Sequence, residues 1–181
     1  MDEGAAVRTK QDLIDHTGAA WDDFVTYVDA LTMEQWTVPR DEAGWSVKDH
    51  VSHVTLWDRA VIRRLRHNVP MEETLEISTG AWADESVDPM NEEIRRLALA
   101  DAVDRVCADR DATWIEVVSL LEDLGEEQLA RSGEEAGLAV GTAPVSGSVL
   151  TVLASYWGDH YREHLEAIKA IVADASEPET G

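Results

Sequence analysis

Two histidines, His160 and His164, stand four residues apart in the stretch Ser155-Tyr-Trp-Gly-Asp-His-Tyr-Arg-Glu-His-Leu-Glu-Ala-Ile168. In a helix, residues at this spacing lie one above the other on the same face. Both histidines fall within an apolar stripe of helical period, which contains Leu153, Tyr156, Trp157, Leu165, Ile168 and Ile171. Imidazoles that face a core are costly unless a partner satisfies their nitrogens. A metal ion is such a partner, because neutral imidazole is its commonest side-chain ligand.

A helical pair supplies only two ligands, so a third must come from another segment. The best candidate is His53, at the edge of the apolar stripe of a second helical segment. His50 lies closer to the centre of that stripe, and spacing alone leaves the choice between the two open. Three histidines from two helices would form a facial ligand set for Zn, Ni, Fe or Mn, with open positions for water. The alternative is that the histidines are polar core residues satisfied by the backbone or by one another.

Other residues near the histidines have predicted roles at this site. Asp159 and Glu163 neighbour the expected ligands in sequence but point roughly 100° away on a helix, so they suit hydrogen bonds to the ligands better than the metal itself. Aromatic residues are expected to line or flank a pocket beside the metal, although each could equally be plain core: Trp57, Trp157 and Tyr161, with Tyr156 as a rival. Water bound to such a metal would have a pKa of about 7 and act as a nucleophile.

Hydrophobic periodicity predicts four long helices that would position these residues. They cover residues 9–31, 46–67, 90–124 and 147–173, with a break expected near Leu99-Ala-Asp101 in the third. The predicted fold is therefore all-α, a four-helix bundle with long crossover connections, in the order up-down-down-up or a related one. The last connection, residues 125–146, is polar and Gly-rich and is expected to be a mobile loop over one end of the core.

Composition excludes several classes of protein. The chain of 181 residues carries 37 acidic against 15 basic residues, a net charge of −22, which disfavours nucleic-acid binding. Adaptation to high salt and an ordinary acidic protein both explain this charge. No run of about 18 apolar residues and no secretory signal is present, so we expect no membrane span and a cytoplasmic location. Residues 1–174 are expected to form a single domain and 175–181 a disordered tail.

Three further features have structural interpretations. Cys107 is the one cysteine, so it cannot form an internal disulfide, and it is expected to be a buried structural thiol. His16 is expected at the surface or rim of the first helix. The basic residues at the end of the second helix suit its dipole better than an anion site, and they are Arg63, Arg64, Arg66 and His67.

Several segments resemble the DinB-like (YfiT-like) superfamily of metal-binding four-helix bundles, with the ClbS/DfsB type as the nearest branch. They are Thr9-Lys-Gln-Asp-Leu13, Gly44-Trp-Ser-Val-Lys-Asp-His-Val-Ser-His-Val-Thr-Leu-Trp-Asp58, Asn91-Glu-Glu-Ile94 and Asp159-His-Tyr-Arg-Glu-His-Leu-Glu-Ala-Ile168. In that family the histidine eight residues after the tryptophan of Trp-Ser-Val-Lys is a ligand. The resemblance therefore implies His53, with His160 and His164, and makes His50 a neighbour.

The resemblance also implies a range of activities. Members include transferases and isomerases that use a low-molecular-weight thiol such as mycothiol or bacillithiol, and a self-resistance protein that hydrolyses a reactive cyclopropane. We therefore expect a metal-dependent hydrolase or thiol-dependent transferase that acts on a small electrophile, with residues 126–146 as a gate. The alternatives are a non-catalytic metal-binding stress-response bundle and a structural protein whose histidines staple two helices. A homodimer is expected, because dimers are common among DinB-like proteins.

Overall fold

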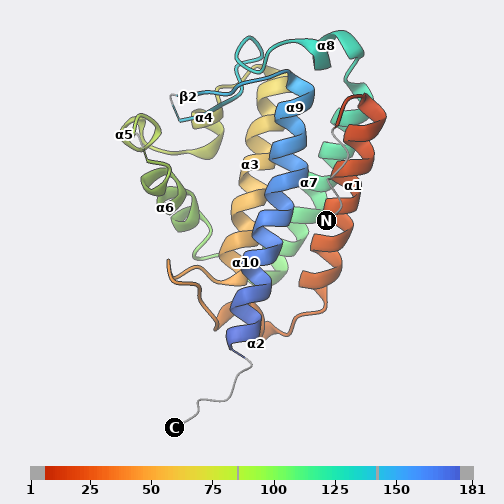
Figure 1. Cartoon of the computed structure of the whole chain (residues 1–181). Coiled ribbons are helices and arrows are strands. Elements are labelled where there is room, and N and C mark those ends of the chain that lie inside the picture. Colours follow the sequence, from red (N-terminus) through yellow and green to blue (C-terminus); the bar gives the residue numbers. More distant parts are fainter. Residues whose placement is uncertain (1–6, 85, 142, 176–181) are drawn as a thin grey trace.

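The computed structural model describes residues 7–84, 86–141 and 143–175. Figure 1 shows its long helices packed side by side, as the hydrophobic periodicity predicts. The bundle consists of α1 (Lys10–Asp29), α3 (Val47–His67), α7 (Val103–Asp123) and a C-terminal helix made of α9 (Val149–Leu153), the π-helical turn η1 (Ala154–Asp159) and α10 (His160–Asp174). The all-α fold class is thereby confirmed.

Side-chain contacts at both ends of α3 and α7 show that these two helices run parallel. In the first turn of α3, the Lys48 ammonium donates hydrogen bonds to the carbonyls of Leu99 and Asp101, just before α7 begins. Near the end of α3, Arg66 pairs with Asp123 at the end of α7, with 3.0 Å between nitrogen and oxygen.

The first and last helices form the other parallel pair. His16, early in α1, lies 3.2 Å from the Asp159 carboxylate, and the Lys169 ammonium near the end of α10 lies over the Tyr27 ring near the end of α1. The chain reverses between α1 and α3 through α2 (Met33–Thr37), at the lower end of the bundle in Figure 1. The order is therefore up-down-down-up, and α3 and α10 are antiparallel neighbours.

Local sequence explains where α3 begins and ends. Ser46 caps its N-terminus by accepting a hydrogen bond from the Asp49 N–H, while Asp49 accepts one in return from the Ser46 N–H. At the other end, Asn68 adopts the left-handed conformation at φ 55°, which stops the helix. Arg64 and Arg66, in the last turn, are consistent with the structural interpretation of the basic residues there.

The first crossover lies outside the bundle beside α3 (Figure 1) and contains short helices. These are α4 (Met71–Leu75), α5 (Thr79–Trp82) and α6 (Asp88–Leu97). Residues 98–102 separate α6 from α7, so the third predicted helix is broken where Leu99-Ala-Asp101 suggested.

The second crossover differs from the mobile polar loop that the sequence suggested. It contains α8 (Glu126–Ala130) and a two-stranded antiparallel ribbon of β1 (Ala139–Val140) and β2 (Ala143–Pro144). Leu129 and Leu138 are buried, and the Gly133 N–H donates to the Gly147 carbonyl. Backbone hydrogen bonds therefore order this segment, and apolar burial together with the hydrogen bond from the Arg64 guanidinium of α3 to the Ala136 carbonyl holds it against the bundle.

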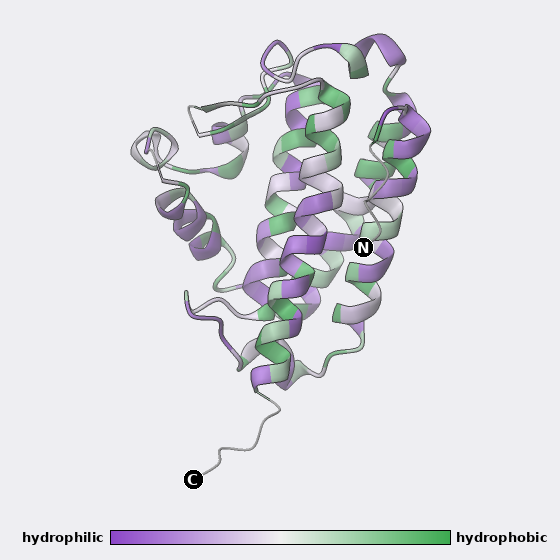
Figure 2. Ribbon diagram, in the orientation of Figure 1, coloured by the Kyte–Doolittle hydropathy of each residue, from purple (hydrophilic) through white to green (hydrophobic). Residues whose placement is uncertain are grey.

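Figure 2 shows hydrophobic residues alternating with hydrophilic ones along the long helices, which is typical of amphipathic helices. Aromatic rings fill the centre of the bundle, where Trp21 of α1 stacks on Trp114 of α7 at 4.4 Å between ring centroids. The Tyr161 ring lies against both tryptophans, and its hydroxyl donates a 2.5 Å hydrogen bond to the buried Asp58. Cys107 on α7 is half-buried, and burial raises the pKa of its thiol, which suits a structural role.

Two remaining expectations concern a membrane-spanning helix and the C-terminal tail. Among the described residues, no helix combines the length and the apolar composition that crossing a bilayer requires. The expected tail at 175–181 falls outside the described residues from position 176 onward.

Candidate metal centre

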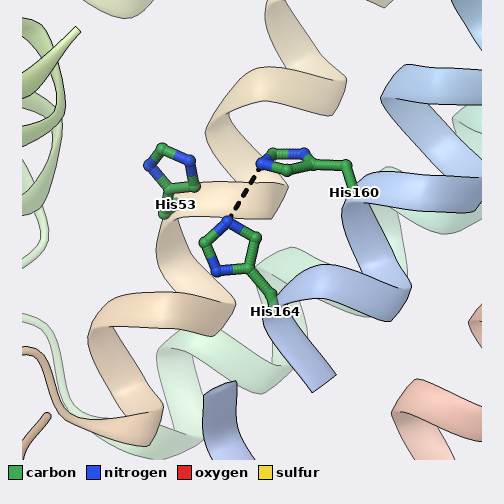
Figure 3. Close-up of side chains that lie close together, drawn as sticks. All are labelled: His53, His160 and His164. Carbon is green, nitrogen blue, oxygen red and sulfur yellow. Dashed lines mark hydrogen bonds between the residues drawn. The ribbon is translucent and has the colours of Figure 1, made fainter. Parts of the chain in front are cut away.

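Three imidazoles converge between α3 and α10 (Figure 3). His53 comes from α3, and His160 and His164 come from the first two turns of α10. The Nε2 atoms of His160 and His164 are 3.0 Å apart, and one ring nitrogen from each of the three residues lies within 4.8 Å of the others. Two nitrogens bound to one ion at about 2.0–2.1 Å must themselves lie roughly 3 Å apart, so the His160–His164 separation fits a shared metal. His53 is near enough to become the third ligand after a small movement of its side chain. These three residues are called the histidine cluster below.

Burial keeps the histidine cluster in its neutral form. Desolvation lowers the pKa of His160 to about 4 and lowers the pKa of His53 and His164 well below the ordinary value, with the neighbouring histidines adding to the effect in both. Neutral imidazole is the form that binds a metal.

Two ring nitrogens of the histidine cluster are left without a hydrogen-bond partner among the described residues. Within the described part of the chain, Nδ1 of His53 and Nδ1 of His160 are buried with no well-formed hydrogen bond. The Tyr156 carbonyl, one turn before His160, favours the protonated ring and so partly opposes the lowering of its pKa. Buried polar atoms of this kind usually have a partner. His160 Nδ1 points away from the ring nitrogen that faces His164, so it is free to bond to a neighbouring group while Nε2 binds an ion. The three converging imidazoles are a donor set that suits a divalent metal ion.

His50 contacts Nδ1 of His164, whereas His160 contacts Nε2 of the same ring. The Nδ1 atoms of His50 and His164 are 2.8 Å apart, so one donates a hydrogen bond to the other. On its far side, His50 Nε2 lies 3.3 Å from the Asp41 carboxylate. Burial lowers the pKa of His50, and the Asp41 charge opposes this. The structure thus brings His53 into the cluster of three and places His50 where it contacts the other nitrogen of a cluster member.

Trp45 covers the cluster from the connection before α3. Its ring centroid lies 5.3 Å from that of His50 and 5.2 Å from that of His53. Trp57 packs on the other side of His53 at 6.3 Å. Trp45 was not among the residues predicted at the site, since nothing in a connecting segment shows which side chains it approaches.

A π-helical turn immediately precedes His160. The His160 N–H bonds to the Ser155 carbonyl five residues back, in place of the usual four. Gly158 in this turn lies so close to α1 that a Cβ atom there would overlap the His16 ring. This wider turn, which periodicity did not predict, changes the phase of the residues before His160 relative to α10.

A cavity of about 560 Å³ opens beside His53 and His160. Trp57 lines this cavity, as expected from the sequence, and so does Tyr156, the rival candidate for the same role. Trp157 and Tyr161 do not line it, because both rings are buried in the core, and Tyr161 is bonded there to Asp58. The phase change at η1 accounts for the position of Trp157. Asp159 and Glu163 also line the cavity beside His160, although the sequence placed them about 100° away from the expected ligands.

Asp58 is a buried ionisable residue that sequence reasoning did not single out. It lies five residues after His53 on α3, and burial raises the pKa of its carboxyl group well above the ordinary value. Burial and the nearby Asp58 likewise raise the pKa of Tyr161. An acidic residue within an apolar stripe was the available signal for this buried pair.

Comparisons with known proteins bear on the family and the fold of this chain. The family model of the DinB superfamily matches residues 16–168, a range that includes the whole histidine cluster. A crystal structure of an uncharacterised protein from Escherichia coli UTI89 is similar in fold, with a TM-score of 0.69 and 12% sequence identity over 94% of this chain and 96% of that one. At this identity the likeness extends to the fold alone. No curated protein matched the chain.

Proposed function

Because this chain belongs to the DinB superfamily, we propose that it binds a divalent metal ion through His53, His160 and His164 and acts on a small electrophilic compound. Zn or Ni is the first choice of metal, and Fe or Mn the second. The observation that carries the proposal is the convergence of three neutral imidazoles, one buried and two half-buried, two of which line a cavity of about 560 Å³. A closed structural site would not need such a cavity.

The residues around the cavity suit a reaction on a small molecule. When bound, the ion would supply Lewis-acid chemistry that lowers the pKa of a nucleophile beside it. Glu163 is exposed on the cavity wall, three residues after His160, and is placed to accept a proton there. Trp57 and Tyr156 offer apolar faces for the body of a ligand. The nucleophile is water in a hydrolase and a low-molecular-weight thiol in a transferase, and the ClbS/DfsB-type branch of the family suits the hydrolase.

A second candidate is a non-catalytic bundle in which the metal staples α3 to α10. The position of the histidines between these helices favours it, since a shared ion would cross-link them. Chelation would then cause a large fall in melting temperature, and the bound metal would not take up exogenous azide or thiol. An open site predicts uptake of these ligands. We further propose a homodimer, which sedimentation of the full chain would test.

The test of metal binding is titration of metal-free protein with Zn or Ni, with calorimetry as readout and elemental analysis of the loaded product. We expect one equivalent to bind, and we expect His160→Ala to weaken binding by about 100-fold or more. His67→Ala is the matched control, because His67 is an exposed histidine at the end of α3. Absence of binding in the unchanged protein, or equal binding by the His160 variant, would refute the proposal.

A further inference from the structure

The charges on the cavity wall all have the same sign. Among the described residues that line it, Asp159 and Glu163 are acidic and no lysine or arginine is present. The wall itself therefore offers nothing to offset a negative charge on a ligand.

Glu163 is the carboxylate available to a ligand. Asp159 is already engaged, because its carboxylate lies 3.2 Å from His16 and 3.5 Å from the Arg162 guanidinium. Within the described part of the chain, Glu163 has no ion pair or hydrogen bond of its side chain, although it is exposed and lies on the cavity wall. The net charge of −22 over the whole chain extends the same preference to approaching molecules.

The rest of the wall is largely apolar. The Trp57 and Tyr156 rings lie with centroids 5.9 Å apart at an angle of 39°, so they present two aromatic faces from α3 and η1. Val87 and Met90 add apolar surface from the first crossover. Aromatic faces attract an apolar body and also a cation through the ring quadrupole.

Building on the proposed function, we infer that the cavity selects ligands with a mainly apolar body and no negative charge, and that a positively charged or polar group of the ligand lies toward Glu163. An anion would lose its hydration beside carboxylates, with no cationic side chain among the described lining residues to offset its charge, whereas an ammonium group gains an ion pair.

The test uses metal-free full-length protein, so that a bound ion contributes nothing to the charge preference. Calorimetry would compare three ligands with one skeleton: 1-naphthylmethylamine, 1-naphthamide and 1-naphthoate. We expect the amine and the amide to bind at least about tenfold more tightly than the carboxylate. Glu163→Gln should reduce the advantage of the amine over the carboxylate by roughly threefold or more. Glu166→Gln, a carboxylate one turn on that pairs with Lys169, should leave it unchanged.

Thr151→Trp locates the binding, because Thr151 is an exposed residue on the cavity wall and a bulky ring there fills the space. This variant should abolish binding of all three ligands while its melting temperature shows that it folds. Naphthoate binding as tight as that of the amide, failure of every ligand to bind, or binding that survives in the folded Thr151 variant would each overturn the inference. Metal titration of the same samples separates the two proposals, since metal binding without charge selection removes only the inference, and charge selection without metal binding removes only the proposed function.

Discussion

Replacing His50 by phenylalanine tests whether the contacts behind the histidine cluster control its metal affinity. Phe retains a ring in the buried site but removes the nitrogen 2.8 Å from His164 and the one 3.3 Å from Asp41. His164 then loses the partner that fixes its Nδ1, and with it the orientation of the Nε2 atom that lies 3.0 Å from His160. Loss of such a supporting partner weakens metal binding by roughly 10- to 100-fold, about 1.4–2.7 kcal/mol. We expect a loss of this size.

The measurement is a competition titration of metal-free protein against a chelator of known affinity, with melting curves to show that each variant folds. His50→Asn is the matched control, because its side-chain amide nitrogen reaches about the position of Nδ1 and preserves much of the contact with His164. We expect it to lie between the unchanged protein and the Phe variant. A folded Phe variant with unchanged affinity would refute the role of His50. A loss as complete as that of His164→Ala would make His50 a ligand instead.

Three further predictions concern stability. The pKa of His160 falls from 6.5 to about 4 on folding, so the unfolded chain binds more protons between these pH values. Metal-free protein should therefore lose about 3 kcal/mol of folding stability from this residue as the pH falls from about 6.5 to 4. A free energy of unfolding in urea that stays constant across this range would contradict the prediction. Gly158→Ala should destabilise the fold by about 1–3 kcal/mol, because the new methyl group overlaps the His16 ring of α1. Gly18→Ala, where a Cβ atom has open space, should stabilise it by about 0.5–1 kcal/mol. Equal shifts in the two unfolding curves would contradict the packing argument. Tyr161→Phe removes a hydrogen bond from the buried Asp58 and should cost about 1–3 kcal/mol, and an unchanged denaturation midpoint would show that the bond contributes little.

The long helices could be predicted because their signals are local. An amphipathic stripe specifies each one, and a cap such as Ser46 with Asp49 specifies where α3 begins. The π-helical turn could not be predicted, because a single wider turn leaves no periodic signal in the sequence. It lies where Gly158 packs against the His16 ring of α1, a contact between segments far apart in the chain. The ribbon of β1 and β2 was missed because strands of two residues carry no periodicity.

The candidate site divides in the same way. His160 and His164 share a helix face at any bundle geometry, so their spacing predicted a pair. His50 and His53 are three residues apart on α3, and which of them faces the pair depends on how α3 is rotated against α10. Spacing could not decide this, and the structure places both near His164, with ring centroids at 5.1 Å and 4.8 Å. Trp45 and Asp41 reach the site from a connection whose path no local signal specifies.

The two long connections account for much of the cavity wall beside the histidine cluster. In an up-down-down-up bundle the parallel helices α3 and α7 must be joined by a long crossover. The C-terminal helix runs antiparallel to α7, so the connection before α9 is longer than a simple reversal requires. Both crossovers return to the space between α3 and the C-terminal helix, and they supply Met90 and Val145 to the cavity wall. The bundle helices thus carry the metal-binding residues, and the crossovers carry much of the surface that a ligand would meet. Substitutions in the crossovers can therefore change which molecule is accepted without moving the histidine cluster, whereas the cluster depends on the packing of α3 against α10.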